Sequence, residues 1–415
     1  MRQDIMKAIS IVLLLLASSI PIAIADNRIS IPEHDNGTIQ PLVVWNYTRL
    51  LTPRDFCVAD DGTVFAVNVL RGWELVRSPT IPAEFVAFSD TGELLWIKNY
   101  FMHELALFGV TTDDTHVFAT GLGVEGLFVG KYDFDGNSIW NYTHDFGELG
   151  SGVKISVSEE GYVIVCTSWV SSFFKNFEYA HLVVLNPDGE YLWHKSFQDY
   201  AFVDCDSHFI YILQENVLEK YGMDESLVWS VSITEERRVT AHNDILFCYQ
   251  LGELLCESIL MVEGWNPHSG GRTWSSTMTL YNSENQVFNI TDVDSCTTQD
   301  ESLVLLFARP MNRSRSWHLL MVNDNGLPIR YFSILDESWY SALCKSIDSG
   351  QIIVVGTSSE TDFTVAVYDS SGPEPPYDLA ISESVDYFLI GITLIGVIVF
   401  DTSLIIILKR RYTQI

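Results

Sequence analysis

The chain has 415 residues, of which 47% are hydrophobic and 13% aromatic, so it can bury a large core in one or two domains. Its formal net charge of −30 opposes contact of the folded part with nucleic acid or anionic lipid. Such an excess of carboxylates is typical of a solubilising surface.

Residues 1–25 are predicted to be a secretory signal peptide. Arg2 and Lys7 precede an apolar run from Ala8 to Ile24, and the end of this run fits a small-x-small cleavage site. An uncleaved anchor is the alternative, but the apolar run is short and is interrupted near Pro21. Residues 26–41 are polar and mixed, and we expect a lead-in without regular structure.

From residue 42 onward, a strand, a tight acidic turn and a second strand recur along the chain. In the clearest copy, Lys131–Thr143, the turn ends at Gly136 and Trp140 follows four residues later. Further copies, weaker toward the end of the chain, are Gly92–Trp96, Gly189–Trp193, Glu225–Trp229, Glu284–Phe288 and Gly326–Arg330. Their last positions lie from 36 residues apart (Trp193 to Trp229) to 59 residues apart (Trp229 to Phe288), a range typical of one small antiparallel sheet per repeat.

A second strand-turn-strand unit lies between these copies, as in Cys57–Val67 and Ile155–Val165. Each repeat therefore has four strands, A to D, and we predict an all-β fold, a seven-bladed β-propeller over residues 42–370. Thr364–Asp369 is a C strand without a following D strand, and Leu42–Thr48 is a D strand without a preceding C strand. Pairing of these N- and C-terminal strands would close the ring and remove the exposed edge.

The pattern Tyr132-Asp133-x-Asp135-Gly136-x-x-x-Trp140 resembles the propeller repeats of microbial cell-surface proteins and, more distantly, pyrroloquinoline-quinone-type repeats. The resemblance covers about residues 42–370 and implies a propeller rather than a particular activity. The turn is one residue shorter than in the quinoprotein pattern, and the sequence lacks an adjacent cysteine pair. We therefore expect no quinone and no other cofactor.

The A–B and C–D turns are short and acidic and share one face, while the B–C and D–A connections share the opposite face. We place the variable loops there, including the segment from Glu263 to Trp274. Their aromatic and arginine side chains are typical of a binding surface. The alternative is that these aromatics only pack beneath their own loops. The candidate binding residues are Trp73, Trp169, Phe173, Phe174, Trp265, His268, Arg272, Trp274, Arg313, Arg315 and Trp317.

The C-terminal segment predicts a single membrane span. The apolar run Tyr387–Leu408 is long enough to cross a bilayer as a helix, and Lys409-Arg410-Arg411 follow it. The positive-inside rule places the tail, residues 409–415, in the cytoplasm and the propeller outside the cell. We therefore expect a linker at 371–385, leaving from the face of the short turns and away from Trp265 and Trp274, and a transmembrane helix at 386–408.

Candidate sites outside the loops are few. Asn-x-Ser/Thr triplets for glycosylation occur at Asn36, Asn46, Asn141, Asn289 and Asn312. Cys248 and Cys256 lie symmetrically about Gly252 and could form a disulfide across a hairpin, whereas cysteines on the A strands are expected to be buried and too far apart to bridge.

Asp401 is the acidic residue inside the predicted span, and it either snorkels to the interface or pairs with another membrane protein. The histidines are scattered, without the paired spacing of a zinc site, and a nucleophile elbow is missing, so we expect no metal site and no catalytic residues. The sequence thus predicts a non-catalytic, membrane-anchored binding or scaffold protein for an extracellular protein or glycan. The rival interpretation is a propeller enzyme that acts on glycans or uses a quinone.

Overall fold

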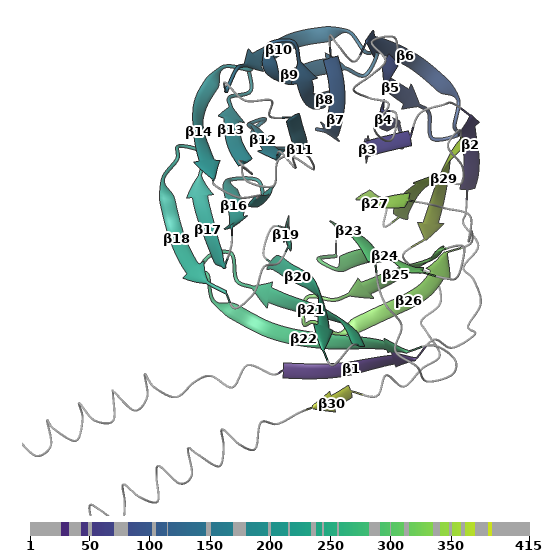
Figure 1. The fold of residues 1–415 in the computed structure, drawn as a ribbon, viewed down its shortest axis with the longest axis vertical. Coiled ribbons are helices and arrows are strands. Elements are labelled where there is room, and N and C mark those ends of the chain that lie inside the picture. The colour runs from purple at the N-terminus through teal and green to yellow at the C-terminus, as the bar shows by residue number, and fades with distance from the viewer. Residues whose placement is uncertain are drawn as a thin grey trace, which may run out of the picture.

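The computed structural model describes the chain in segments. These are residues 26–32, 43–48, 52–69, 82–101, 105–113, 115–146, 151–168, 180–197, 201–214, 216–233, 238–242, 245–254, 257–281, 291–298, 300–310, 315–334, 341–347, 351–357, 362–369 and 381–383. Within these residues the strands form seven antiparallel four-stranded blades around a common axis (Figure 1). The predicted all-β, seven-bladed propeller is confirmed.

The strands of each blade follow one another from the axis outward. Blades 1 and 2 contain β3 (Thr52–Val58), β4 (Val64–Val69), β5 (Pro82–Phe88), β6 (Leu94–Phe101), β7 (Leu105–Thr112), β8 (His116–Gly123), β9 (Gly126–Asp133) and β10 (Ser138–His144). Blades 3 and 4 contain β11 (Ser151–Val157), β12 (Val163–Ser168), β13 (Ala180–Leu185), β14 (Tyr191–Phe197), β15 (Ala201–Cys205), β16 (Phe209–Gln214), β17 (Val217–Gly222) and β18 (Leu227–Ser232). Blades 5 and 6 contain β19 (Arg238–His242), β20 (Ile245–Leu254), β21 (Glu257–Trp265), β22 (Arg272–Tyr281), β23 (Thr291–Thr297), β24 (Leu303–Pro310), β25 (Arg315–Val322) and β26 (Pro328–Ile334).

Blade 7 closes the ring as the sequence predicts. It contains β27 (Ser341–Ile347), β28 (Gln351–Thr357), β29 (Asp362–Asp369) and, as its outermost strand, β2 (Val43–Thr48). β2 pairs antiparallel with β29, from Val43 opposite Val367 to Thr48 opposite Asp362. The first and last strands of the propeller therefore share one sheet, which fixes the blade count.

Blade 5 carries two further strands that the sequence does not predict. β1 (Asp26–Pro32) pairs in parallel with the outer strand β22, and β30 (Ile381–Glu383) pairs antiparallel with β1. Both lie outside the ring in Figure 1. The lead-in at residues 26–41 therefore contains a strand, and part of the segment 371–385, expected to be a linker, is bound to the propeller.

The C–D hairpins share one turn design. In blade 2 the amide of Gly136 donates to the carbonyl of Asp133, and Gly136 has a φ of +83°, which an L side chain rarely adopts. The pairing then shifts by one residue, because Tyr132 faces Ser138 while Lys131 faces Trp140. Ile139 between them is the extra residue of a β-bulge, a device that re-aims side chains. The same shift occurs in the described C–D hairpins of blades 1, 3, 4, 5 and 6.

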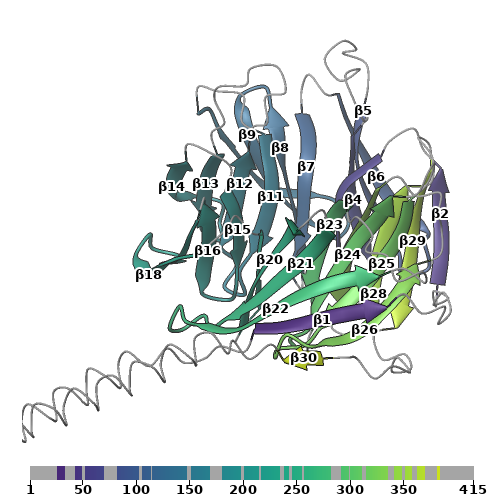
Figure 2. The same ribbon diagram turned by 60° about the horizontal axis from the view of Figure 1, so that its bottom comes forward.

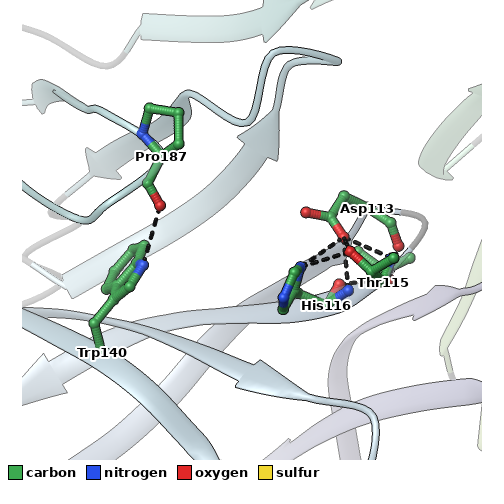
Figure 3. Close-up of polar contacts among 6 residues, drawn as sticks. Asp113, Thr115, His116, Trp140 and Pro187 are labelled. Carbon is green, nitrogen blue, oxygen red and sulfur yellow. Dashed lines mark hydrogen bonds and ion pairs between the residues drawn. The ribbon is translucent and has the colours of Figure 1, made fainter.

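In blades 1 to 5, the tryptophan that follows the bulge ties its blade to the next one. The indole N–H of Trp140 donates to the carbonyl of Pro187 in the C–D turn of blade 3 over 3.2 Å (Figure 3). The ring also lies against Gly189 of that turn, where a Cβ would come within 2.6 Å of it. The corresponding bonds of other blades are Trp96 to Phe134, Trp193 to Met223, Trp229 to Pro267 and Trp274 to Asp324. The tryptophan of one repeat thus contacts the C–D turn of the next, and together they join neighbouring blades.

The A–B turns are stabilised mainly within themselves. Figure 3 shows the turn of blade 2, where the Asp113 carboxylate accepts hydrogen bonds from the amides of Thr115 and His116 over 2.8 and 2.6 Å. The imidazole of His116 lies 3.3 Å from the same carboxylate oxygen. Short polar side chains that bond to the backbone two or three residues on are typical of such turns. The acidic residues of these turns therefore have a local structural role.

The hydrophobic core lies between blades. One cluster joins Phe118 and Val129 of blade 2 to Val163, Val183 and Leu185 of blade 3, all fully buried. Another joins Trp317 of blade 6 to blade 7. Every strand between the inner and outer edges faces a neighbouring blade on both sides, which explains runs such as β12, whose side chains from Val163 to Thr167 are all buried.

One expected repeat copy is misplaced. The sequence predicts the outer strand of blade 5 at Glu284–Phe288, but this strand is β22, and Trp274 takes the place of the repeat tryptophan. The segment between β21 and β22 is therefore a C–D turn, and the prediction that it is a variable loop of the opposite face is wrong. Residues 284–288 lie outside the described residues.

We call the side with the A–B and C–D turns the turn face and the side with the B–C and D–A connections the loop face. β1 runs parallel to β22 with Asp26 opposite Ser275, so β1 begins near the C–D turn of blade 5. β30 runs in the opposite direction and Glu383 pairs with Asn27, so the chain leaves this edge toward the turn face. β1 and β30 lie along β22 in Figure 2 as well. This exit lies close to Trp274, which belongs to the turn face rather than to the loop face on which the sequence places it.

Candidate functional site

The predicted binding residues do not form one surface in the described part of the chain. Trp73, Trp169, Phe173, Phe174 and Arg313 lie outside it. Trp317 is only 1% exposed, because it belongs to β25 and packs between blades 6 and 7. Arg315 is the first residue of β25.

The predicted residues of blade 5 lie on the turn face. Trp265 and Trp274 are 6% and 7% exposed, which leaves little of either ring for a partner. His268 is exposed at the turn, whose backbone is held by the side chain of Asn266. Arg272 donates over 2.7 Å to the carboxylate of Glu263, which is nearly buried. These contacts stabilise the hairpin, and a binding role for these residues stays a prediction.

The remaining predicted sites have mixed outcomes. Asn141 is exposed on β10, so its side chain is open to glycosylation, and Asn46 belongs to β2. Asn36, Asn289, Asn312, Cys256 and Asp401 lie outside the described residues. The hairpin about Gly252 is not formed, because β20 continues through Gly252 to Leu254, and Cys248 pairs in register with Glu263.

The sequence missed a set of carboxylates on the innermost strands. Asp55 on β3 accepts the amide of Val110 on β7 over 2.9 Å, and Asp204 on β15 accepts the amide of Ala241 on β19 over 3.0 Å. Asp294 on β23 likewise accepts the amide of Cys344 on β27 over 2.8 Å. In each case an acid of one blade binds the inner strand of the next. The carboxylates therefore join the blades close to the axis, as the tryptophans do at the rim.

A lysine of blade 7 lies between two of these acids. Removal from water raises the pKa of Asp55, while the Lys345 ammonium and the bound Val110 amide limit the rise. Burial opposes the charge on Lys345, but the carboxylates of Asp55 and Asp294 together raise its pKa. Lys345 is thus held as a cation between blades 1 and 6, and the charges compensate one another.

Other charged groups also form contacts between neighbouring blades. Lys154 lies 3.4 Å from the Asp204 carboxylate, which accepts a hydrogen bond from Ser156 as well. Lys220, only 2% exposed, donates over 2.9 Å to the carbonyl of Pro267 in the next blade. Burial lowers the pKa of Lys220. Such groups are structural ties, and nowhere among the described residues do three or more metal-ligating side chains come together.

An aromatic and histidine patch lies on the outer wall of blades 2 and 3. The ring of Phe146 lies 4.3 Å from those of His144 and His181, and it stacks on His181 with an angle of 7°. His194 is exposed beside them, and its Nδ1 is 2.7 Å from the hydroxyl of Tyr191, which is 43% exposed. These residues come from different parts of the chain without a common spacing, so no pattern in the sequence indicates the patch.

The comparisons with known proteins leave the function open. The chain matches neither a protein-family model nor a curated protein. A protein of unknown function from Bacteroides caccae shares 12% identity and a TM-score of 0.38, over 60% of this chain and 89% of that one. The Pan2 WD40 domain of Neurospora crassa shares 9% identity and a TM-score of 0.46, over 80% of this chain and 92% of that one. At these values the fold assignment rests on the strand pairing described above.

Proposed function

We propose that this chain is a membrane-anchored propeller that acts outside the cell as a non-catalytic binding or scaffold protein, with a protein or a glycan as partner. The observation that carries the proposal is the place where the chain leaves the propeller. At Glu383 the chain runs toward the turn face, and three residues separate Glu383 from the apolar run that begins at Tyr387. The loop face is then directed away from the bilayer, toward a partner.

The described architecture fits a rigid platform. The inner carboxylates and the outer tryptophans tie neighbouring blades together. A scaffold of this kind tolerates sequence change in its loops, where binding residues concentrate. The signal peptide at 1–25 and the span at 386–408 supply export and anchoring in this proposal. Among the described residues, no helix is long and apolar enough to cross a membrane.

The enzyme alternative would need reactive groups that are not already engaged in the structure. Asp55 and Lys345 are charged groups near the axis whose pKa values are raised, yet the Asp55 carboxylate already binds the Val110 amide and the Lys345 ammonium is compensated by the neighbouring carboxylates. A perturbed pKa alone does not separate a catalytic group from a structural one. The binding proposal therefore takes precedence, and the enzyme remains the rival hypothesis.

Topology and partner can be tested on the full chain. Protease added outside intact cells should remove the propeller and leave a short membrane-bound remnant. Proximity labelling and a glycan array should then identify a partner whose capture is lost in Trp169→Ala with Phe173→Ala. The matched control is Asp135→Asn on the turn face, which should leave capture unchanged. A propeller protected from external protease, or capture lost only in the control, would contradict the proposal.

A further inference from the structure

Large hydrophobic side chains are exposed at one recurrent position of the described blades. This position is the bulge residue before the repeat tryptophan in blades 1 to 4, together with the residue that precedes it in blades 1, 3 and 4; in blade 2 the preceding residue is Ser138. We call these residues the apolar arc, and their exposed fractions lie between 40% and 52%: Leu94, Leu95, Ile139, Tyr191, Leu192, Leu227 and Val228.

The fold does not require apolar residues at this position. In blade 5 the same two places hold Arg272 and Thr273, and the hairpin forms with the same bulge. In blade 6 they hold Pro328 and Ile329, of which the first is buried and the second half-buried. The bulge turns these side chains away from the sheet in blades 1 to 4, where they gain no core contacts. Large apolar side chains that are exposed at equivalent places of four neighbouring blades in an acidic chain indicate a contact with another phase or molecule.

The short segment between the propeller and the predicted span indicates which surface the apolar arc contacts. This inference rests on the anchoring proposed above. Because β30 is paired with β1, only residues 384–386 separate the propeller from the apolar run at Tyr387. Three residues span roughly 10 Å when fully extended. The turn-face edge of blade 5 then lies at the bilayer surface, and blade 4, with Leu227 and Val228, adjoins it.

We propose that the apolar arc rests on the outer leaflet of the bilayer that holds the C-terminal span. Leucine, isoleucine, valine and tyrosine side chains are suited to the interfacial region, where aromatic rings are enriched. Acidic residues such as Asp135, Asp188 and Asp224 project from the turns beside the arc. The contact therefore favours a leaflet without net negative charge, because anionic headgroups would repel these carboxylates.

The test places a photo-crosslinking amino acid at Leu95 or at Leu192 of the full chain, reconstituted in phosphatidylcholine nanodiscs. The matched control is Val124, which is 78% exposed in the β8–β9 turn on the loop face. Irradiation should give lipid adducts at both arc positions and not at Val124. Equal lipid adducts at all three positions, or protein adducts in place of lipid adducts at the arc, would overturn the inference.

A second pair of measurements separates this inference from the proposed anchoring. Leu192→Glu with Val228→Glu should reduce the lipid adduct formed at Leu95, while the circular dichroism spectrum of the strands stays unchanged. Carbonate extraction reports the anchor independently. A chain that resists extraction yet gives no lipid adducts at the arc refutes the arc contact alone, whereas a chain that carbonate extracts refutes the anchoring itself.

Discussion

The contact between Trp140 and Gly189 gives the sharpest test of how the blades are held together. Gly189 has a φ of +80°, and a Cβ there would lie 2.6 Å from the indole ring of Trp140. In Gly189→Ala the left-handed backbone costs about 1–2 kcal/mol, and displacing the packed ring adds about 1–3 kcal/mol. We expect the free energy of unfolding to fall by the sum, about 2–5 kcal/mol.

Gly161 provides a matched control in the same blade. Its φ of +82° carries the same backbone cost, but the nearest atom to an added Cβ is the Pro187 side chain at 3.3 Å. Gly161→Ala should therefore lose only about 1–2 kcal/mol. Denaturant titration of the solubilised full chain, followed by tryptophan fluorescence, measures both variants. The double variant Trp140→Ala with Gly189→Ala should show a coupling that relieves the extra cost of the alanine.

Two results would refute this reasoning. One is an equal loss in Gly189→Ala and Gly161→Ala, within about 0.5 kcal/mol, the scatter expected for independent sites. The other is a double variant whose loss equals the sum of the two single losses, since the added methyl group would then not contact the indole ring of Trp140. Either result would mean that the contact between Trp140 of blade 2 and Gly189 of blade 3 does not stabilise the propeller.

Three further groups of variants test the electrostatics and the backbone, and the reactivity of one cysteine tests its burial. Asp204→Ala should cost about 1–3 kcal/mol in unfolding free energy, because the half-buried Ala241 amide loses its acceptor, whereas Asp204→Asn keeps an oxygen there and should cost less. Burial raises the pKa of Asp55 above its ordinary value of 3.8. The free energy of unfolding of the protein, relative to that of Asp55→Asn, should therefore fall as pH rises above 3.8. A difference in unfolding free energy that does not change with pH would contradict this. Glu225→Gly should stabilise the chain by about 1 kcal/mol, because Glu225 has a φ of +69°. Burial raises the pKa of Cys166 to about 12, so at pH 8 this thiol should react with maleimide only after unfolding, as peptide mass spectrometry can show.

The propeller could be predicted because its blades are encoded locally. The turn at Asp133–Gly136 and the tryptophan four residues later repeat with enough fidelity to show where strands begin and end. The unpaired strands at the two ends of the repeat region predicted the β2–β29 closure, which the pairing confirms. Local turn chemistry and repeat counting therefore sufficed for the fold class.

Contacts between distant segments could not be predicted in the same way. Asp55 binds the amide of Val110, 55 residues further on, and the sequence around Asp55 does not distinguish it from a surface carboxylate. Ile29 and Ile31 alternate with polar residues, but they do not indicate that β1 adds to blade 5 rather than to another edge. The placement of Trp265 and Trp274 on the loop face is wrong because the weak copy at Glu284–Phe288 predicts the outer strand of blade 5 there, whereas this strand is β22.

The added strands of blade 5 determine how mechanical load enters the molecule. A pull on the chain beyond Glu383 acts first on β30, which is paired with β1, and β1 is paired with β22 over seven residue pairs. Because the pull runs along these strands, their hydrogen bonds resist it together in shear instead of opening one after another. The ring closure between β2 and β29 lies behind this connection and bears the force only after it yields. Force applied to the chain beyond Glu383 would thus detach the terminal strands before the ring opens.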